Sequence, residues 1–530
     1  MKQKHRFFLR YGLLSLLIST FILLTAPAQA AVFPLEITNI KPAGTGTPAI
    51  PSTNRIFRAY PGIEYNIRAA VIGGQYPYTF SLSNAPSGMT INSATGEIKW
   101  PNPQANSGTI TLAVRDSETT TVTSTWTITV TSSTNDFIFV NSAYSGTSTG
   151  SISQPYSTLA AMLASQTNNN KIVYFRKGTY QLAIYNNAAN RPREMDLGNS
   201  PRTWIGYPGE TAVLQGGSAS GQATMITAWD PFYFDQLTIL NTIDYGIRSA
   251  GGTNYKTVRR CIFNGLEPSD NTNNNYGFIH TVAGNSGYYM VVQDNEFTNW
   301  RGASAIGSMY DDNKALIENN YIHSPKASST YSGIGVTAGI SPKYRTDYLT
   351  VRGNKVVMNT GDLMGGNNAA FIDADNVEIC FNLFHKTAGR GGHKFDLEAP
   401  QQGATYYWRN TLIGDLVIKN GGGPYSVNNN VISNPNTSYD EYFITNFISR
   451  NVSTFTSSVT VANNLTNTTP SALIDTGNQY KLVSAQSTNV GSRGWQLANG
   501  STPMELGSAS TPPVTPPTET APAPMGLNIK

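Results

Sequence analysis

Charge, cysteine and long apolar segments are all scarce in this 530-residue chain. Only 13% of its residues are charged, and its net charge of +4 includes the Lys and Arg residues of its first ten positions. A nucleic-acid-binding protein needs a basic stripe, so this balance argues against a nucleic-acid partner. After residue 30 no apolar stretch is long enough to cross a bilayer, so we expect no membrane span in the mature chain.

The first thirty residues predict a secretory signal peptide. MKQKHRFFLR is a basic leader, GLLSLLISTFILL is an apolar core, and Ala28 and Ala30 form a small-residue cleavage pattern. Pro27 ends the apolar run, which disfavours a retained membrane anchor. We therefore expect a secreted protein, located outside the cell, at its surface or in the periplasm. The Pro- and Thr-rich residues 501–530 predict a disordered tail.

Residues 32–132 predict a small β-sandwich. Short alternating runs such as YNIRAAV, GEIKW and GTITLAVRD are separated by turn signals such as GGQYP and NSATG. The stretch YPYTFSLSNAPSGMTINSATGEIKWPNP resembles immunoglobulin-like domains of the cadherin-like superfamily. That resemblance implies an accessory module that serves as a spacer or a binding domain.

Residues 136–497 repeat a short strand that is interrupted by one polar position. This position is occupied by Cys261 in the first copy and then by Asn295, Asn320, Asn354, Asn382, Asn410, Asn430 and Asn464. Irregular intervals of 20 to 34 residues are typical of a solenoid with variable loops. Stacked coils place equivalent residues about 4.8 Å apart. We therefore expect an asparagine ladder, with each Asn in the left-handed conformation at a corner.

The ladder and the entry segment DFIFVNSAYSGTSTGSISQPYSTL resemble right-handed parallel β-helix proteins of the pectate-lyase-like superfamily. The expected fold class is all-β, a right-handed parallel β-helix preceded by the immunoglobulin-like sandwich, and STLAAMLA is expected to form an N-terminal capping helix. Cys261 and Cys380 would lie four ladder steps apart, or roughly 19 Å. A disulfide needs Cα atoms within about 7 Å, so we expect two buried free thiols.

A second set of strands follows the ladder strands and includes YGIRSA, YGFIHTV, SGIGVTA, NAAFIDAD, HKFDLEA and GDLVIKN. Alternate residues of a strand face opposite sides, so the residue after each inward apolar residue faces solvent. The outward column is expected to contain Arg248, His280, Gly307, Gly335, Asp373, Asp396 and Lys419. Asp375, Lys394 and Glu398 would share this face, with Arg390 and His393 at its edge.

The charged end of this column favours catalysis on an acidic polysaccharide by β-elimination. The resemblance implies that Asp373, Asp375, Asp396 and Glu398 could hold Ca²⁺. Lys394, or alternatively Lys419, would act as the base, and Arg390 would hold the sugar carboxylate. His393 belongs to the candidate catalytic set, and Lys419, His280 and Arg248 are candidate substrate-binding residues.

Two alternatives remain open from the sequence. Asp373 and Asp396 on adjacent coils would match the roughly 5 Å carboxylate spacing of retaining glycoside hydrolases, and Asp375 with Asp396 the wider inverting spacing. The chain lacks the Trp-Ile-Asp-His motif of the commonest pectate lyases. A non-catalytic glycan-binding adhesin, with the charges forming a solvated face, therefore stays a rival hypothesis. In each case we expect a monomer whose partner is a polysaccharide or glycan.

Overall fold

The computed structural model describes a chain that is almost entirely β-structure. The signal peptide predicted at residues 1–30 and the tail predicted at 501–530 lie outside the described residues. The described residues are 33–165, 170–186, 193–198, 200–217, 222–249, 252–269, 276–282, 287–302, 304–309, 312–326, 338–342, 346–364, 376–387, 392–396, 405–413, 415–419, 425–428, 430–433, 459–462, 465–467, 474–475, 480–482 and 495–497.

Residues 33–130 form an immunoglobulin-like sandwich, which we call the module. Its two three-stranded antiparallel sheets have the orders β3-β7-β6 and β5-β8-β9. Alternating side chains from both sheets fill its core, among them Ile67, Ile98, Leu112 and Trp126. The elements are β1 (Glu36–Ile37), η1 (Arg55–Phe57), β2 (Arg58–Ala59), β3 (Tyr65–Arg68), β4 (Val71–Ile72), β5 (Thr79–Ser83), β6 (Thr90–Ile91), β7 (Glu97–Trp100), β8 (Ile110–Arg115), β9 (Thr121–Trp126) and β10 (Thr129–Val130).

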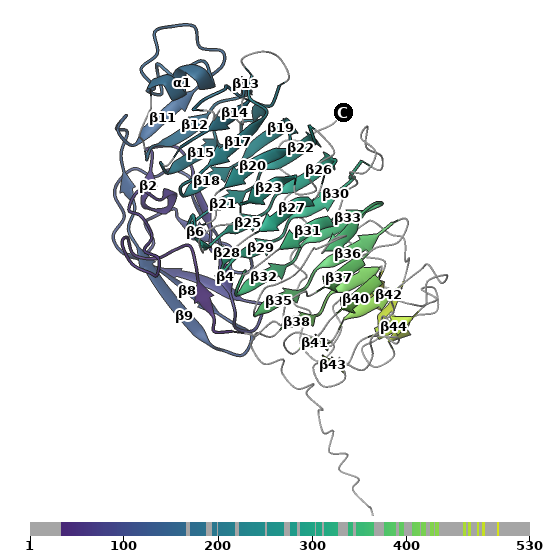
Figure 1. Cartoon of the computed structure of the whole chain (residues 1–530). Helices are drawn as coiled ribbons and strands as arrows, with labels where there is room; N and C mark the ends of the chain where they lie inside the picture. Colours follow the sequence, from purple (N-terminus) through teal and green to yellow (C-terminus); the bar gives the residue numbers. More distant parts are fainter. Residues whose placement is uncertain are drawn as a thin grey trace, which may run out of the picture.

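The rest of the described chain is a right-handed parallel β-helix with three long parallel sheets, as the sequence predicted (Figure 1). The first sheet contains β11 (Phe137–Val140), β12 (Ile172–Phe175), β15 (Arg202–Gly206), β18 (Phe232–Asp235), β21 (Thr257–Arg259), β25 (Val291–Gln293), β29 (Leu316–Glu318), β32 (Leu349–Arg352), β35 (Val377–Cys380), β38 (Thr405–Trp408), β41 (Tyr425–Asn428) and β43 (Val459–Ala462).

The second sheet contains β13 (Gly178–Gln181), β16 (Ala212–Gln215), β19 (Leu237–Ile243), β22 (Ile262–Glu267), β26 (Glu296–Trp300), β30 (Tyr321–His323), β33 (Lys355–Met358), β36 (Leu383–Lys386), β39 (Thr411–Ile413), β42 (Val431–Ser433) and β44 (Leu465–Asn467). The third sheet contains β14 (Glu194–Asp196), β17 (Met225–Ala228), β20 (Tyr245–Ser249), β23 (Gly277–Thr281), β27 (Ser304–Met309), β31 (Ala338–Pro342), β34 (Asp362–Met364), β37 (Gly392–Asp396) and β40 (Asp415–Lys419).

Three short elements complete the described structure. The pair β24 (Gly287–Tyr288) and β28 (Asp312–Asn313) and the sheet of β45 (Ile474–Asp475), β46 (Tyr480–Leu482) and β47 (Trp495–Leu497) lie outside the three long sheets. Helix α1 (Leu159–Ser165) forms within the predicted capping segment and buries Leu159, Met162 and Leu163. Within the described residues no helix has the length and apolarity needed to cross a membrane.

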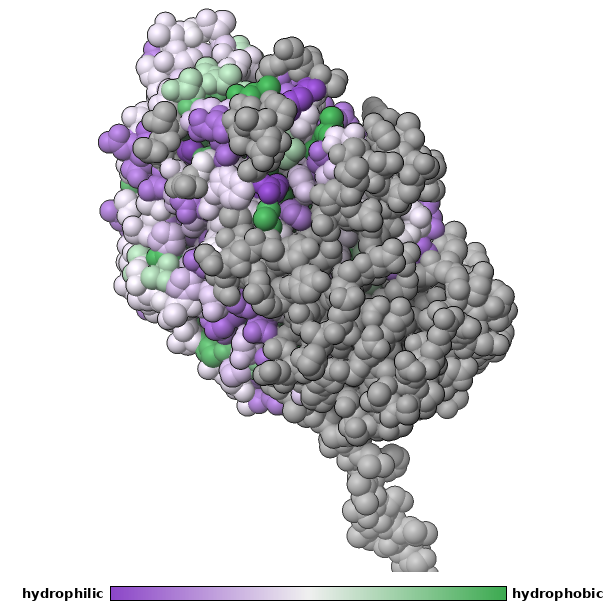
Figure 2. Space-filling model, viewed as in Figure 1, coloured by the Kyte–Doolittle hydropathy of each residue, from purple (hydrophilic) through white to green (hydrophobic). Residues whose placement is uncertain are grey.

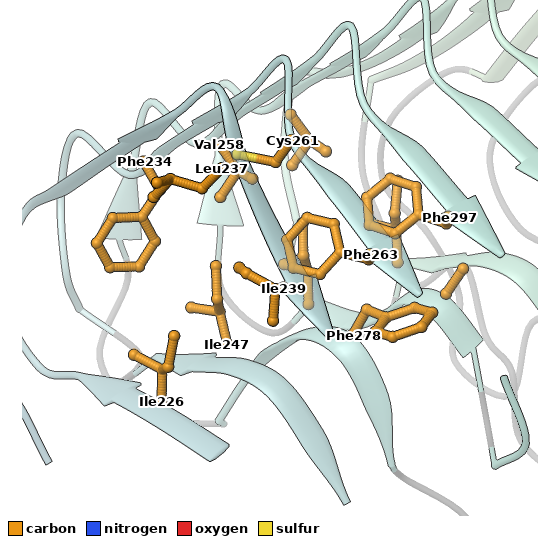
Figure 3. Close-up of a cluster of buried hydrophobic side chains, with 14 of the residues drawn as sticks. Ile226, Phe234, Leu237, Ile239, Ile247, Val258, Cys261, Phe263, Phe278 and Phe297 are labelled. Atoms are coloured by element: carbon orange, nitrogen blue, oxygen red, sulfur yellow. The ribbon is translucent and has the colours of Figure 1, made fainter. Parts of the chain in front are cut away.

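The interior of the β-helix is filled by apolar side chains from all three sheets. Phe234 and Val258 come from the first sheet, Ile239 and Phe263 from the second, and Ile247 from the third (Figure 3). Phe263 and Phe297 stack on successive coils with ring centroids 4.8 Å apart, which matches the strand spacing of a sheet. Each coil therefore buries its apolar face against its neighbours, which is why the repeat forms a stack.

The predicted asparagine ladder is present from Asn295 to Asn430. In each step the side-chain amide nitrogen of one Asn donates to the amide oxygen of the next, at 2.9 to 3.1 Å. The same oxygen also accepts the backbone N–H of the preceding ladder Asn. Cys261 begins the series, because its backbone N–H donates to Asn295. Asn464 lies outside the described residues.

The predicted conformation of the ladder residues was wrong by one position. The residue before the ladder Asn has the positive φ, as at Asp294 (59°), Asn319 (57°), Phe381 (57°) and Arg409 (49°). The left-handed residue turns the chain out of the first sheet. The Asn that follows can then place its amide in the buried ladder, where each polar atom finds a partner.

Both cysteines are buried free thiols, as predicted. Cys261 packs in the interior of the β-helix, and Cys380 lies under the module beside Phe381 and Trp408. Burial raises the pKa of the Cys261 thiol to about 12. Neither thiol is therefore placed for reaction in the folded protein.

The module packs along the outer face of the first sheet. Tyr60 contacts Phe137 on β11 at the start of the β-helix. Tyr76 contacts Phe381, which directly follows β35, eight strands further along the same sheet. Figure 1 shows the module strands beside the first sheet. The module therefore does not project from the β-helix as the spacer that its sequence resemblance had suggested.

Candidate functional site

The third sheet carries an outward column of polar residues whose register is fixed by an inward apolar column. The inward positions are Met195, Ile226, Ile247, Ile279, Ile306, Ile340 and Met364. The next residue of each strand forms the outward column of Asp196, Thr227, Arg248, His280, Gly307 and Ser341. The sequence correctly placed Arg248, His280 and Gly307 side by side.

The structure adds three aromatic residues to Arg248 and His280. The Arg248 guanidinium carbon lies 5.2 Å from the ring centroid of Trp229 and 5.8 Å from that of Tyr245. The Tyr245 ring lies 4.7 Å from the His280 imidazole and 5.6 Å from the Tyr276 ring. We call these five residues the Arg248 cluster.

The Arg248 cluster is partly covered and carries a cation. His280 is only 6% exposed, whereas Arg248, Trp229 and Tyr245 are half-buried. A guanidinium held against aromatic faces is fixed in place at little cost in conformational entropy, because the rings and the planar fork are rigid. Such a group can bind a carboxylate through two parallel hydrogen bonds.

A buried hydroxyl adjoins this cation in the same column. The Thr227 side chain is fully buried, and its Oγ1 has no hydrogen-bond partner among the described residues. Thr227 pairs in register with Arg248 on the next strand.

One carboxyl with a perturbed pKa flanks the cluster. Asp230 follows Trp229 directly and is half-buried. Burial raises the pKa of the Asp230 carboxyl above its ordinary value, and Arg202 opposes this shift. The described part of the site therefore combines a cation, aromatic faces, a buried hydroxyl and one carboxyl of raised pKa. The Arg248 guanidinium in this setting suits binding of an anionic group.

The densely charged end of the predicted column falls largely outside the described residues. Asp373, Asp375, Arg390 and Glu398 are not among them, and of His393, Lys394, Asp396 and Lys419 only the backbone is described. In that backbone Asp396 pairs with Lys419 across β37 and β40, as expected. His393 pairs with Met364 and Leu416, so Lys394 takes the register position of the Arg248 column.

Four positions of the predicted column were wrong. Asp396 and Lys419 do pair with each other, but they lie two residues beyond Lys394 and Val417, which take the register of Arg248. Gly307 pairs with Ser341 on β31, where the sequence predicted Gly335. In the sheet order β37 follows β34, where the sequence predicted a strand at 368–375 containing Asp373. The physical reason is that β34 has only three residues. A strand this short shows too little alternation to be recognised in a sequence.

A metal site is not evident in the described part of the chain. No group of three or more His, Cys, Asp or Glu side chains there could hold an ion. The four predicted Ca²⁺ ligands Asp373, Asp375, Asp396 and Glu398 lie outside the described side chains. The Ca²⁺ expectation therefore remains untested by the geometry.

The aromatic members of the site were not predicted from the sequence. Trp300 is fully buried in the core, and Tyr289 packs against the module, so neither belongs to the site. Trp229 and Tyr276 each border a strand of the third sheet, immediately after β17 and immediately before β23. The sequence did contain a signal for these site residues, because each is an aromatic residue placed at one end of a strand of the third sheet.

Comparison with known proteins identifies the module. Residues 47–131 match the family described as Putative Ig domain. Among solved structures, a rhamnogalacturonan lyase aligns with 10% identity and a TM-score of 0.33 over 62% of this chain and 87% of its own. A putative α-galactosidase from Bacteroides fragilis aligns with 10% identity and a TM-score of 0.17 over 38% of this chain and 45% of its own. No curated protein sequence matches the chain.

Proposed function

We propose that this protein is a secreted enzyme that binds an acidic polysaccharide along the third sheet and cleaves it by β-elimination. The observation that carries the proposal is the Arg248 cluster, in which a half-buried guanidinium lies between Trp229 and Tyr245 in an outward column. A uronic-acid residue offers the carboxylate for Arg248 and an apolar ring face for an aromatic side chain.

The column is long enough to bind several sugars at once. Lys394 takes the same register column as Arg248, five strands further along the sheet. Five steps of about 4.8 Å separate the two positions by roughly 24 Å. Arg248 therefore serves substrate binding at a distance from Lys394, and one extended chain would contact both.

Cleavage is assigned to the β37 end of the sheet. Lys394 would remove the proton next to the sugar carboxylate, and Arg390 would hold that carboxylate. Asp373 and Asp396 complete the proposed catalytic set, whereas His393 takes the register position of the inward column. Ca²⁺ held by Asp373, Asp375, Asp396 and Glu398 would supply additional positive charge, and Lys419 would bind substrate beside Asp396.

The test is incubation of the purified mature protein with a panel of acidic polysaccharides, with Ca²⁺ or with a chelator. Absorbance near 235 nm reports the unsaturated product of β-elimination. We expect a rise that Lys394→Ala abolishes, and a higher KM with little change in kcat for Arg248→Ala. Lys99→Ala, on the module surface, is the matched control.

Two other results would replace this proposal. New reducing ends without absorbance would indicate a glycoside hydrolase that uses paired carboxylates. Binding that needs Arg248 but gives neither product would indicate a non-catalytic glycan-binding protein. Absence of both binding and products over a broad panel would contradict a carbohydrate function.

A further inference from the structure

We propose that the module is an intramolecular brace that locks the coils of the β-helix together, and not a separate recognition domain. This inference does not depend on the proposed enzymatic function. It follows from the length of the contact, from the residues that form it and from the face of the module that it uses.

The contact runs along most of the first sheet. Arg58 pairs with Asp136 at 3.5 Å immediately before β11, and Tyr76 packs in the cluster of Cys380, Phe381 and Trp408 at β35 and β38. From β11 to β38 the sheet order contains ten neighbouring strands, and their span is roughly 43 Å at about 4.8 Å per step. One sandwich therefore contacts coils that are far apart in the stack.

Two guanidinium groups link the module to successive coils. Arg68 of the module pairs with Asp294 and, at 3.1 Å, with Glu318. Arg352 of the β-helix pairs with Glu318 at 2.6 Å and donates to Tyr78 Oη at 3.0 Å and to the Val71 carbonyl at 3.1 Å. Although burial alone would raise the pKa of the Glu318 carboxyl, Arg352 and Arg68 hold it below its ordinary value.

Apolar contacts on both sides of this network indicate a permanent contact. Ile63 packs on Phe137, Phe139, Ile172, Tyr174 and Ile205 at the start of the first sheet. Phe33, Ala70 and Ile72 pack on Val291 and Leu316 nearer its middle. Without the module, the β-helix residues of these two clusters would form an exposed apolar strip. Soluble proteins rarely expose such strips, so the first sheet needs its cover.

The docking contact also occupies the face that a recognition domain would otherwise offer. Asn66, Arg68 and Glu97 point out of the sheet β3-β7-β6, and Asn66 accepts a hydrogen bond from Arg259 of the β-helix at 2.9 Å. The opposite sheet faces solvent, and its outward residues on β5 and β9 are Ser and Thr. The described surface seen in Figure 2 is mostly hydrophilic, with scattered apolar residues.

The first test asks whether the module stays bound to the β-helix after the chain that connects them is cut in the full-length protein. A protease recognition sequence is inserted between Thr134 and Asn135, which are exposed and lie between β10 and β11. After folding and cleavage, we expect both fragments to co-elute in gel filtration at micromolar concentration and to separate only in denaturant. Separation of two folded fragments in native buffer would overturn the proposal.

The second test locates the effect of the brace. Arg68→Ala leaves Asp294 and Glu318 without a shared partner, and breaking a buried pair is strongly destabilising. We expect amide exchange in β25, β29 and β32 to accelerate on the order of a hundredfold. Arg115→Ala, which removes an exposed cation from β8 in the opposite sheet of the module, should change nothing in the β-helix. Acceleration confined to the module strands would contradict a brace, and the cleavage test remains decisive if Arg68→Ala fails to fold.

Discussion

Trp408 donates its indole N–H to the Glu378 carboxyl at 3.0 Å, and both side chains are buried on the outer face of the first sheet. Burial raises the pKa of Glu378 to about 7, with Arg352 and the Trp408 hydrogen bond opposing the shift. The other oxygen, Oε2, has no hydrogen-bond partner among the described residues. Glu378 is therefore a carboxyl that the fold prefers in its protonated form.

This preference gives a pH dependence with a definite sign. Because the folded pKa of Glu378 is raised, its stabilising contribution is present below the ordinary pKa of 4.5 and is lost as the pH rises to about 7. The loss is on the order of 3 kcal/mol. Glu378→Gln keeps the hydrogen bond but cannot ionise, so it should be more stable than the natural chain at pH 8 and equal to it near pH 4. Thermal unfolding of both proteins across this range is the measurement. A difference that does not vary with pH would contradict the assignment.

The asparagine ladder makes a second prediction, for Asn354→Ala. The Asn354 amide donates to Asn382 and to the Ile317 carbonyl, and its oxygen accepts from the backbone and side chain of Asn320. Removing it leaves several buried polar groups without partners, each at a cost of about 1–3 kcal/mol. We expect a loss of several kcal/mol in the free energy of unfolding, measured with denaturant.

Asn264→Ala is the matched control for the ladder. Asn264 lies on the outer face of the second sheet and accepts one exposed hydrogen bond from Asn299 at 3.2 Å. Its removal should cost less than about 1 kcal/mol, because water can replace the lost partner. Equal losses at Asn354 and Asn264 would show that the ladder contributes no more than an ordinary surface contact.

The thiols give a third prediction. Because Cys261 and Cys380 are buried and free, the intact mass of the protein should not change on reduction. A thiol reagent such as 5,5′-dithiobis(2-nitrobenzoic acid) should react with neither cysteine at neutral pH and with both after unfolding. In native buffer the reagent should reach the thiols only when the protein unfolds, so any slow reaction should proceed at the unfolding rate. Rapid reaction in native buffer would place a thiol at the surface and contradict the prediction.

The sequence predicted the features that repeat and missed those that occur once. The ladder recurs in each copy, so Asn295 and its successors could be recognised, and Arg248 and His280 followed from the alternation of their strands. The left-handed corner residues include Asp294 and Asn319, which favour that conformation, but also Phe381 and Arg409, which do not, so residue type does not mark the corner consistently. β34 is too short to show alternation.

The contacts between distant segments could not be predicted for a different reason. Asn66 and Arg68 alternate with apolar residues on β3, which is also the pattern of an ordinary solvated face. Only the complementary charges of Asp294 and Glu318, more than 200 residues away in the chain, show that this face is covered. The Arg248 cluster likewise joins Trp229 at the end of one strand to Tyr245 and His280 on the next two.

The last prediction concerns Arg248, whose role in binding can be separated from catalysis. Arg248→Ala should weaken binding of an acidic polysaccharide at least about tenfold, because a charge-assisted pair of hydrogen bonds is lost. Arg248→Lys should restore the charge but only part of the affinity, because an ammonium cannot reproduce the planar fork over Trp229 and Tyr245. Isothermal titration with a polymer and its carboxyl-reduced form would measure both effects.

Arg176→Ala is a suitable control for this titration. Arg176 also carries a guanidinium over an aromatic ring, 4.3 Å from Tyr207, and it is paired with Glu210 near the start of the β-helix, far from the proposed binding column. Its removal should leave affinity unchanged. If the carboxyl-reduced polymer binds as tightly as the acidic one, or if Arg176→Ala and Arg248→Ala weaken binding equally, Arg248 does not recognise the sugar carboxylate. Its contact with Trp229 and Tyr245 would then serve only to stabilise the third sheet.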